Sequence, residues 1–84
     1  MRVERSFRGI SLRLARHYLE SVGGKVVDEQ TAVGDGWKAE LSEATVPVGQ
    51  SLELTEVTVR FTGEKGILED VIGRYEQKAV RAGG

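Results

Sequence analysis

The N-terminal part of the chain changes its hydrophobic period once. In residues 2–8 the apolar side chains fall only on odd positions, which predicts a half-buried β-strand. In residues 11–22 they recur at helical spacing and leave one polar face, so we predict an amphipathic helix. Ser11 is a suitable N-cap for this helix, and Gly23–Gly24 supplies its end.

The middle of the chain predicts three strands. Alternating or largely apolar runs indicate strands over residues 25–32, 37–42 and 51–62. Gly34-Asp35-Gly36 has the composition of a tight hairpin connection, and residues 46–50 (VPVGQ) have that of a turn. We therefore expect these strands to form an antiparallel sheet.

The last predicted strand changes the phase of its alternation. Either a bulge intervenes near Thr55-Glu56, or the two halves of the strand present their apolar side chains to different faces. The first phase contains Leu52 and Leu54, and the second contains Val57, Val59 and Phe61.

A second amphipathic helix is predicted to start at residues 62–64, with an apolar stripe toward the C-terminus. Gly73 within it indicates close packing or a bend. The order is β-α-β-β-β-α, with one more strand if the long one is split. It defines an α+β two-layer sandwich, in which an antiparallel sheet of four to five strands has two helices on one face. We expect residues 1–84 to form a single domain.

The opposite face of such a sheet is exposed unless another subunit covers it. We therefore predict a homodimer or higher homo-oligomer, formed through that face or an edge strand. The net charge of −1 conceals +4 in residues 1–25 and −5 in residues 26–60. We expect the N-terminal arginines of one copy to pair with carboxylates of residues 28–56 of another.

Composition narrows the class of protein. With 84 residues, of which 39% are apolar, the chain can bury one modest core. The absence of cysteine excludes disulfides, thiolate nucleophiles and cysteine-ligated metals. No apolar run has the ~18–20 residues of a membrane span, and the N-terminus is charged where a signal peptide would be apolar. We expect a cytoplasmic protein that does not associate with membranes.

No residue pattern predicts an enzyme. The single histidine, His17, has no second ligand at metal-binding spacing, and no serine stands in a nucleophile motif. Glu53 and Glu56 project to opposite faces of a strand unless a bulge intervenes, which disfavours an acid–base pair. We expect no catalytic residue, no cofactor and no metal. We expect the chain to bind other proteins without acting as an enzyme.

Two features are candidates for a binding site. Trp37 is either a core anchor, which we favour, or an exposed stacking platform. Arg74, Lys78 and Arg81 share a face of the second helix and, with arginines of the first strand, offer a site for phosphate, nucleic acid or an acidic protein. Pairing with earlier carboxylates such as Asp70 explains this basic stripe as well. Nucleic acid is disfavoured because the aromatic residues do not interleave with basic ones.

The C-terminal Gly83-Gly84 permits another interpretation, because ubiquitin-like sulfur carriers end in a flexible diglycine that is adenylated and thiocarboxylated. A β-grasp carrier begins with a hairpin before its helix and extends its tail from a final strand. In this chain one strand precedes the first helix, and the diglycine follows the second helix. The order of elements therefore disfavours a carrier or protein modifier.

Nearly the whole chain resembles a known family. The segments that show the resemblance are GISLRLARHYLESVGG, GDGWKAELSE, VPVGQSLELTEVTVRFTGE and KAVRAGG. They are similar to small archaeal proteins related to the C-terminal domain of MoaD-related proteins, a family named after the small subunit of molybdopterin synthase. The resemblance implies a TBP-like curved antiparallel sheet with two helices. It also implies a link to molybdopterin or sulfur-carrier pathways through association with a separate protein, and it transfers no catalytic residue.

Overall fold

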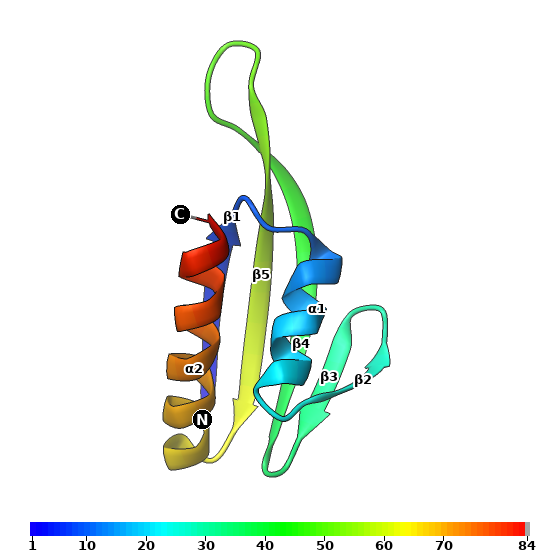
Figure 1. Ribbon diagram of the computed structural model, residues 1–84, viewed down its shortest axis with the longest axis vertical. Coiled ribbons are helices and arrows are strands. Elements are labelled where there is room, and N and C mark those ends of the chain that lie inside the picture. Colours follow the sequence, from blue (N-terminus) through cyan, green and yellow to red (C-terminus); the bar gives the residue numbers. More distant parts are fainter. Residues whose placement is uncertain (84) are drawn as a thin grey trace.

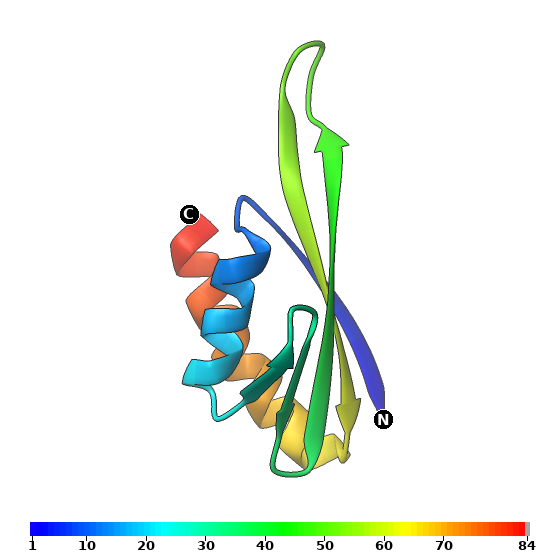
Figure 2. The ribbon, with the colours of Figure 1, turned by 90° about the vertical axis from the view of Figure 1, so that its right-hand side faces the viewer.

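The computed structural model describes the backbone of residues 1–83 and the side chains of residues 1–79. A five-stranded antiparallel sheet has the strand order β1-β5-β4-β3-β2, and both helices lie on one of its faces (Figures 1 and 2). The predicted α+β two-layer sandwich is therefore confirmed. The elements are β1 (Arg2–Arg8), α1 (Leu12–Ser21), β2 (Lys25–Asp28), β3 (Thr31–Gly34), β4 (Trp37–Pro47), β5 (Glu53–Gly63) and α2 (Lys65–Gly83).

Helix α1 begins and ends where its sequence predicts. The hydroxyl of Ser11 accepts a hydrogen bond from the backbone N–H of Leu14 at 3.1 Å, which satisfies one of the free donors of the first turn. At the other end Gly23 has φ +100°, a left-handed conformation that favours glycine. The N–H of Gly24 then donates to the carbonyl of Leu19 at 2.9 Å and closes the last turn.

The single strand predicted over residues 25–32 is wrong, because this segment contains a hairpin turn. Strands β2 and β3 pair with each other, and their register shifts between Val26 and Asp28. The carboxylate of Asp28 accepts a hydrogen bond from the N–H of Gln30 at 2.8 Å. This side chain stabilises the turn in place of the glycine or proline that marks most turns in a sequence.

The turn predicted over residues 46–50 starts too early, because β4 continues to Pro47. The N–H of Leu41 donates to the carbonyl of Gln30, so Leu41 directs its backbone groups to the outer edge of β4. Every second residue after it points the same way, and Pro47 is one of them. No strand lies beside β4 at that position, and the missing N–H of the proline therefore costs no ladder hydrogen bond.

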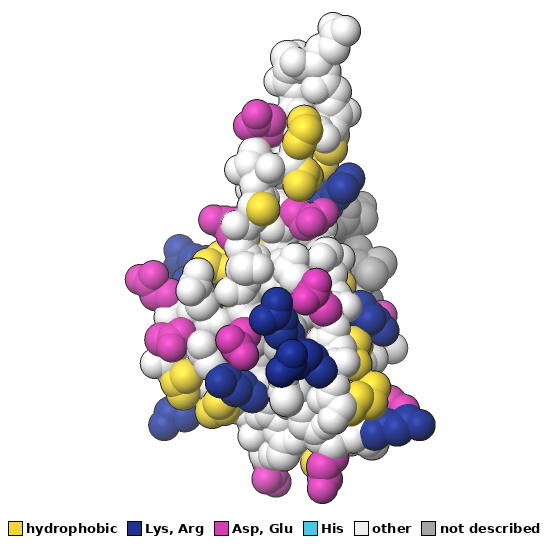
Figure 3. Space-filling model, turned by 180° about the vertical axis from the view of Figure 1, so that it is seen from behind, with side chains coloured by type: hydrophobic (Ala, Val, Ile, Leu, Met, Phe, Trp, Pro, Cys, Tyr) yellow, Lys and Arg dark blue, Asp and Glu magenta, His cyan; other side chains and the backbone are white. Residues whose placement is uncertain are grey.

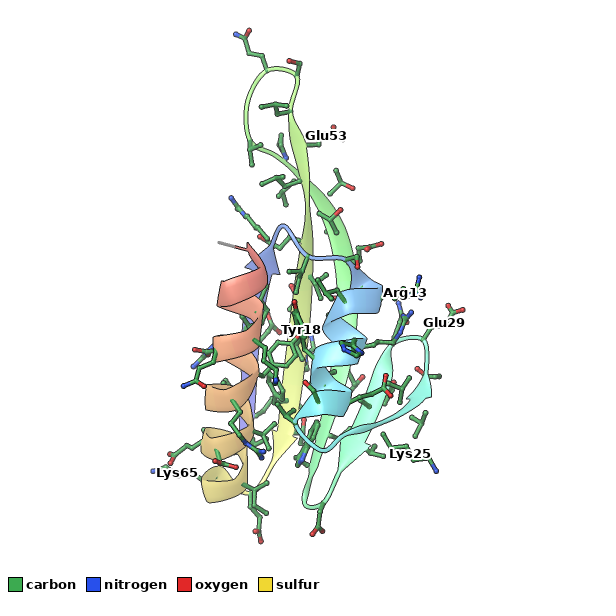
Figure 4. All side chains as sticks on the ribbon, in the orientation of Figure 1. Arg13, Tyr18, Lys25, Glu29, Glu53 and Lys65 are labelled. Carbon is green, nitrogen blue, oxygen red and sulfur yellow. The ribbon has the colours of Figure 1, made fainter. Side chains whose placement is uncertain are left out.

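The core lies between the sheet and the two helices. The ring of Tyr75 on α2 contacts Phe7 and Phe61 edge-on, with centroids 5.2 and 5.7 Å apart, and Tyr18 points between the helices (Figure 4). Apart from the aromatic residues Tyr75 and Trp37, no residue with a polar side chain is buried among residues 1–79. The buried residues are Ile10, Ala15, Leu19, Val22, Ala32, Trp37, Ala39, Leu41, Val57, Val59, Phe61, Leu68, Val71, Ile72, Tyr75 and Ala79.

The interpretation of Gly73 as a close-packing position is wrong. Because its surroundings are open, substitution of Gly73 tests how backbone entropy affects the stability of α2. A Cβ added at Gly73 would meet nothing within 4 Å, and the residue is exposed. Gly73→Ala is expected to raise the free energy of unfolding by about 0.5–1 kcal/mol, because alanine loses less backbone entropy. The control, Gly34→Ala, should destabilise the protein, since its Cβ would overlap the Trp37 indole. Urea unfolding measures both, and a loss of stability in Gly73→Ala contradicts the packing described.

Burial raises the pKa of Tyr75 well above that of a free tyrosine, and the nearby Tyr18 adds to the shift. The unfolded chain therefore ionises this phenol near pH 10 while the folded protein does not. The contribution of the neutral Tyr75 phenol to the free energy of unfolding is complete below that pH. It is lost above that pH, by up to about 1.4 kcal/mol per pH unit. Tyr75→Phe should flatten the alkaline fall in unfolding free energy. The comparison covers pH 9 to 11, about one unit on either side of the ordinary tyrosine pKa. If the unfolding free energy of Tyr75→Phe falls with pH as steeply as that of the unaltered protein, the hydroxyl is not buried.

Candidate protein-binding surface

The hairpin formed by β4 and β5 extends well beyond the rest of the sheet. Strand β3 pairs with β4 only up to Glu40, and β1 pairs with β5 only from Glu56 onward. Residues 43–55, which we call the arm, project past both neighbouring strands and both helices (Figures 1 and 2). The molecule is accordingly elongated, with extents of 42 × 23 × 21 Å.

The apolar residues of the hairpin change faces where the arm begins. The register between β4 and β5 is continuous from Trp37↔Gly63 to Pro47↔Glu53 without a bulge, so the change of phase in β5 reflects two different faces. In β4 the apolar residues also change phase, after Leu41. Strict alternation then places them on the side of the sheet away from the helices. We call this set the apolar face of the arm: Ala44, Val46 and Leu54, continued by Val48 and Leu52 at the turn.

The apolar face of the arm is open to solvent. The exposed fractions of Leu52, Leu54 and Val48 are 67%, 42% and 41%. Elsewhere in residues 1–79 the exposed large apolar side chains are Met1 and Val27. In a chain with 30% charged residues, the nine residues 44–52 contain no charge. Contiguous exposed apolar side chains without charge are typical of a surface that contacts another macromolecule.

Below the arm, the same side of the sheet is polar and paired within the chain (Figure 3). Arg8 and Glu56 form an ion pair at 2.9 Å, and Arg60 lies 3.4 Å from Glu4. The Arg8–Glu56 contact joins an N-terminal arginine to a carboxylate of residues 28–56, but inside one chain. Some of the N-terminal positive charge is therefore neutralised within the chain. On this side of the sheet, the arm is the part suited to an apolar contact that excludes water.

Trp37 is a core residue. Its exposed fraction is 7%, and its ring lies 6.5 Å from that of Phe61. The favoured interpretation is confirmed, and the exposed stacking platform is wrong. Trp37 and Arg74 both line an open hollow of about 380 Å³ between the end of α1, the β3–β4 turn and the start of α2.

The basic stripe of α2 is only partly available. Arg74 lies 2.9 Å from Asp70, the ordinary helical pair expected from the sequence, while Lys78 is exposed. The side chain of Arg81 lies outside the described residues. In β1, Arg5 pairs with Glu76 of α2 at 3.0 Å, whereas Arg8 points to the opposite face of the sheet. Among the described side chains, the β1 arginines Arg5 and Arg8 therefore pair with carboxylates on opposite faces of the sheet and do not form one cluster.

The remaining candidates are dispersed. His17 is exposed on α1. Glu53 lies on the arm (Figure 4), on the face opposite that of Glu56. Within residues 1–79 no three histidine or carboxylate side chains are grouped to hold a metal, and no described helix is long and apolar enough to cross a membrane. Gly83 is the last residue of α2, and Gly84 lies outside the described residues.

The fold and the arm together define a small α+β protein with a projecting apolar hairpin. The sequence model of the archaeal MoaD-like protein family matches residues 3–84. The chain therefore belongs to this family, as the resemblance of its segments indicated. A comparison with curated proteins gives no match.

A pair of identical substitutions tests whether the arm contributes to folding. Leu52→Ala should change the free energy of unfolding by less than about 0.5 kcal/mol, because the side chain is largely exposed. Leu68→Ala in the core should cost about 2–5 kcal/mol. Denaturant unfolding at low protein concentration measures both. A loss for Leu52→Ala comparable to that for Leu68→Ala would mean that the arm packs against its own body.

Proposed function

We propose that this protein is a non-enzymatic binding module that associates with protein surfaces, including further copies of itself, through its arm. The observation that supports this most is the apolar face of the arm. The antiparallel ladder holds Leu54 in water, and the hydrogen bond from the N–H of Val48 to the carbonyl of Leu52 holds those two residues at the turn, although burial of all three would be favourable. A partner that covers them gains this free energy without first having to order the hairpin.

The family match supports a proposal about the pathway to which the partner belongs. The archaeal MoaD-like family takes its name from the small subunit of molybdopterin synthase, and the chain matches over nearly its full length. We propose that the partner is a protein of molybdopterin synthesis or sulfur transfer. The chain would contribute a docking surface, because the arm has apolar side chains where chemistry would need polar ones.

Affinity purification from the native cell tests this role. The protein should recover a protein of sulfur transfer or molybdopterin synthesis, and Leu54→Glu should abolish recovery by placing a charge in the apolar face. The matched control is Thr45→Glu, which adds the same charge to the other face of the arm and should leave recovery unchanged. Equal recovery with Leu54→Glu and the unaltered protein would place the binding surface elsewhere.

The sulfur carrier stays as a second candidate, because the family match extends to Gly84. Deletion of Gly83 and Gly84 separates the two proposals. A docking module should keep its partner after the deletion, whereas a carrier should lose its function. Mass spectrometry of the protein from its native cell shows whether Gly84 ends in a thiocarboxylate or an isopeptide bond, and such a modification would replace the docking proposal by the carrier.

A further inference from the structure

We infer that the apolar face of the arm binds the same face of a second copy, so that two arms pack face to face and antiparallel about a two-fold axis. The inference rests on the proposed protein-binding role and deepens it by naming a second copy as the occupant of the apolar face when no other partner competes for it. It rests on three features of the described residues: the edges of the arm, its distribution of charge, and the length of the face.

The edges of the arm are less suited to pairing than its face. Pro47 points its backbone to the outer edge of β4 and offers no N–H there to a further strand. On the β5 side, the carbonyl of Thr55 is already bonded to the N–H of Gly9 at 3.1 Å. Edge-to-edge addition would also leave Leu54 exposed, because added strands extend a sheet without covering it. Packing of face against face covers the apolar side chains.

The charges of the arm permit contact between two identical faces. Glu43 and Glu53 are partners in register of Val57 and Pro47, which places both carboxylates on the other side of the arm. Glu56, at the base of the apolar face, is paired with Arg8. Two copies can therefore approach through this face without bringing unpaired like charges together, which self-association through an isologous interface requires.

An antiparallel arrangement matches each end of the face with a suitable partner. The centre of the face is the Val46↔Leu54 pair, and the two-fold axis would pass beside it. The Val48 and Leu52 level of one arm then lies over the Ala44↔Glu56 level of the other, and the uncharged tip, with Gln50 and Ser51, reaches past it to the border of the Arg8–Glu56 pair. Amide and hydroxyl groups can hydrogen-bond to such a pair at the rim of an interface.

The size of the face sets the strength of the contact. A standard interface buries about 20–30 residues on each partner. The apolar face of the arm has five, Ala44, Val46, Val48, Leu52 and Leu54. We therefore expect a reversible dimer with a dissociation constant on the order of micromolar or weaker. The dimer should dissociate on dilution, and its two bodies should lie at opposite ends of the paired arms.

Sedimentation equilibrium from micromolar to near-millimolar protein tests the inference. The unaltered protein should shift from monomer to dimer, and Leu54→Glu should weaken the dimer about tenfold or more, because two carboxylates would meet near the axis. Thr45→Glu should leave the equilibrium unchanged. A protein that stays monomeric, a dimer insensitive to Leu54→Glu, or one weakened equally by Thr45→Glu would each overturn the inference.

Oxidative cross-linking gives a readout that does not depend on destabilising the arm. The chain has no cysteine, so single substitutions report alone. Leu54→Cys should form a disulfide-linked dimer under mild oxidation, whereas Thr45→Cys on the other face should not. Equal cross-linking of both variants, or of neither, would overturn the inference. Capture of a different protein through Leu54 by a chain that stays monomeric would also overturn it, while leaving the proposed binding role intact.

Discussion

The alternation of side chains along β4 and β5 is the constraint on which the rest of the structure depends. The two strands keep one register from Trp37 to Pro47, so each side chain faces the side that its position dictates. Up to Leu41 the apolar positions face the helices and build the core. From Ala44 onward they face the other way, and a shift of register by one residue would reverse both assignments. One hairpin thus supplies six of the sixteen core residues buried among residues 1–79 and the whole apolar face of the arm.

Elements with strong local signals were predictable from the sequence. The capped helix α1, the strand β1 and the two-layer order agree with the structure. The β2–β3 turn was missed because the carboxylate of Asp28 stabilises it without a glycine or proline. Pro47 predicts a turn because proline breaks central strands, yet proline is tolerated where no neighbouring strand needs its N–H. The error at Pro47 arises from tertiary context that a local pattern does not contain, whereas the turn at Asp28 depends on a local contact that a search for glycine and proline does not detect.

The candidate site was harder to predict than the fold, because the alternation of apolar side chains along two strands defines it and no single reactive residue does. Trp37 and Arg74 drew attention by their chemistry, and the fold buries the first and pairs the second with Asp70. The phase change in β5 was visible in the sequence. To interpret it, one also needs the matching phase change in β4. That change lies beyond residue 42, where the sequence predicts that the strand ends. Internal pairing of Arg8 with Glu56 likewise followed only from the pairing of distant strands.

If the apolar face of the arm is a contact surface between copies of the chain, its side chains change environment as the protein concentration rises. Methyl NMR spectra recorded over a dilution series test it most directly, because they report each side chain separately. We expect the methyl resonances of Val46, Leu52 and Leu54 to move with concentration, while those of the buried Val59 and Leu68 stay fixed. Arm resonances that do not change up to near-millimolar protein would contradict it.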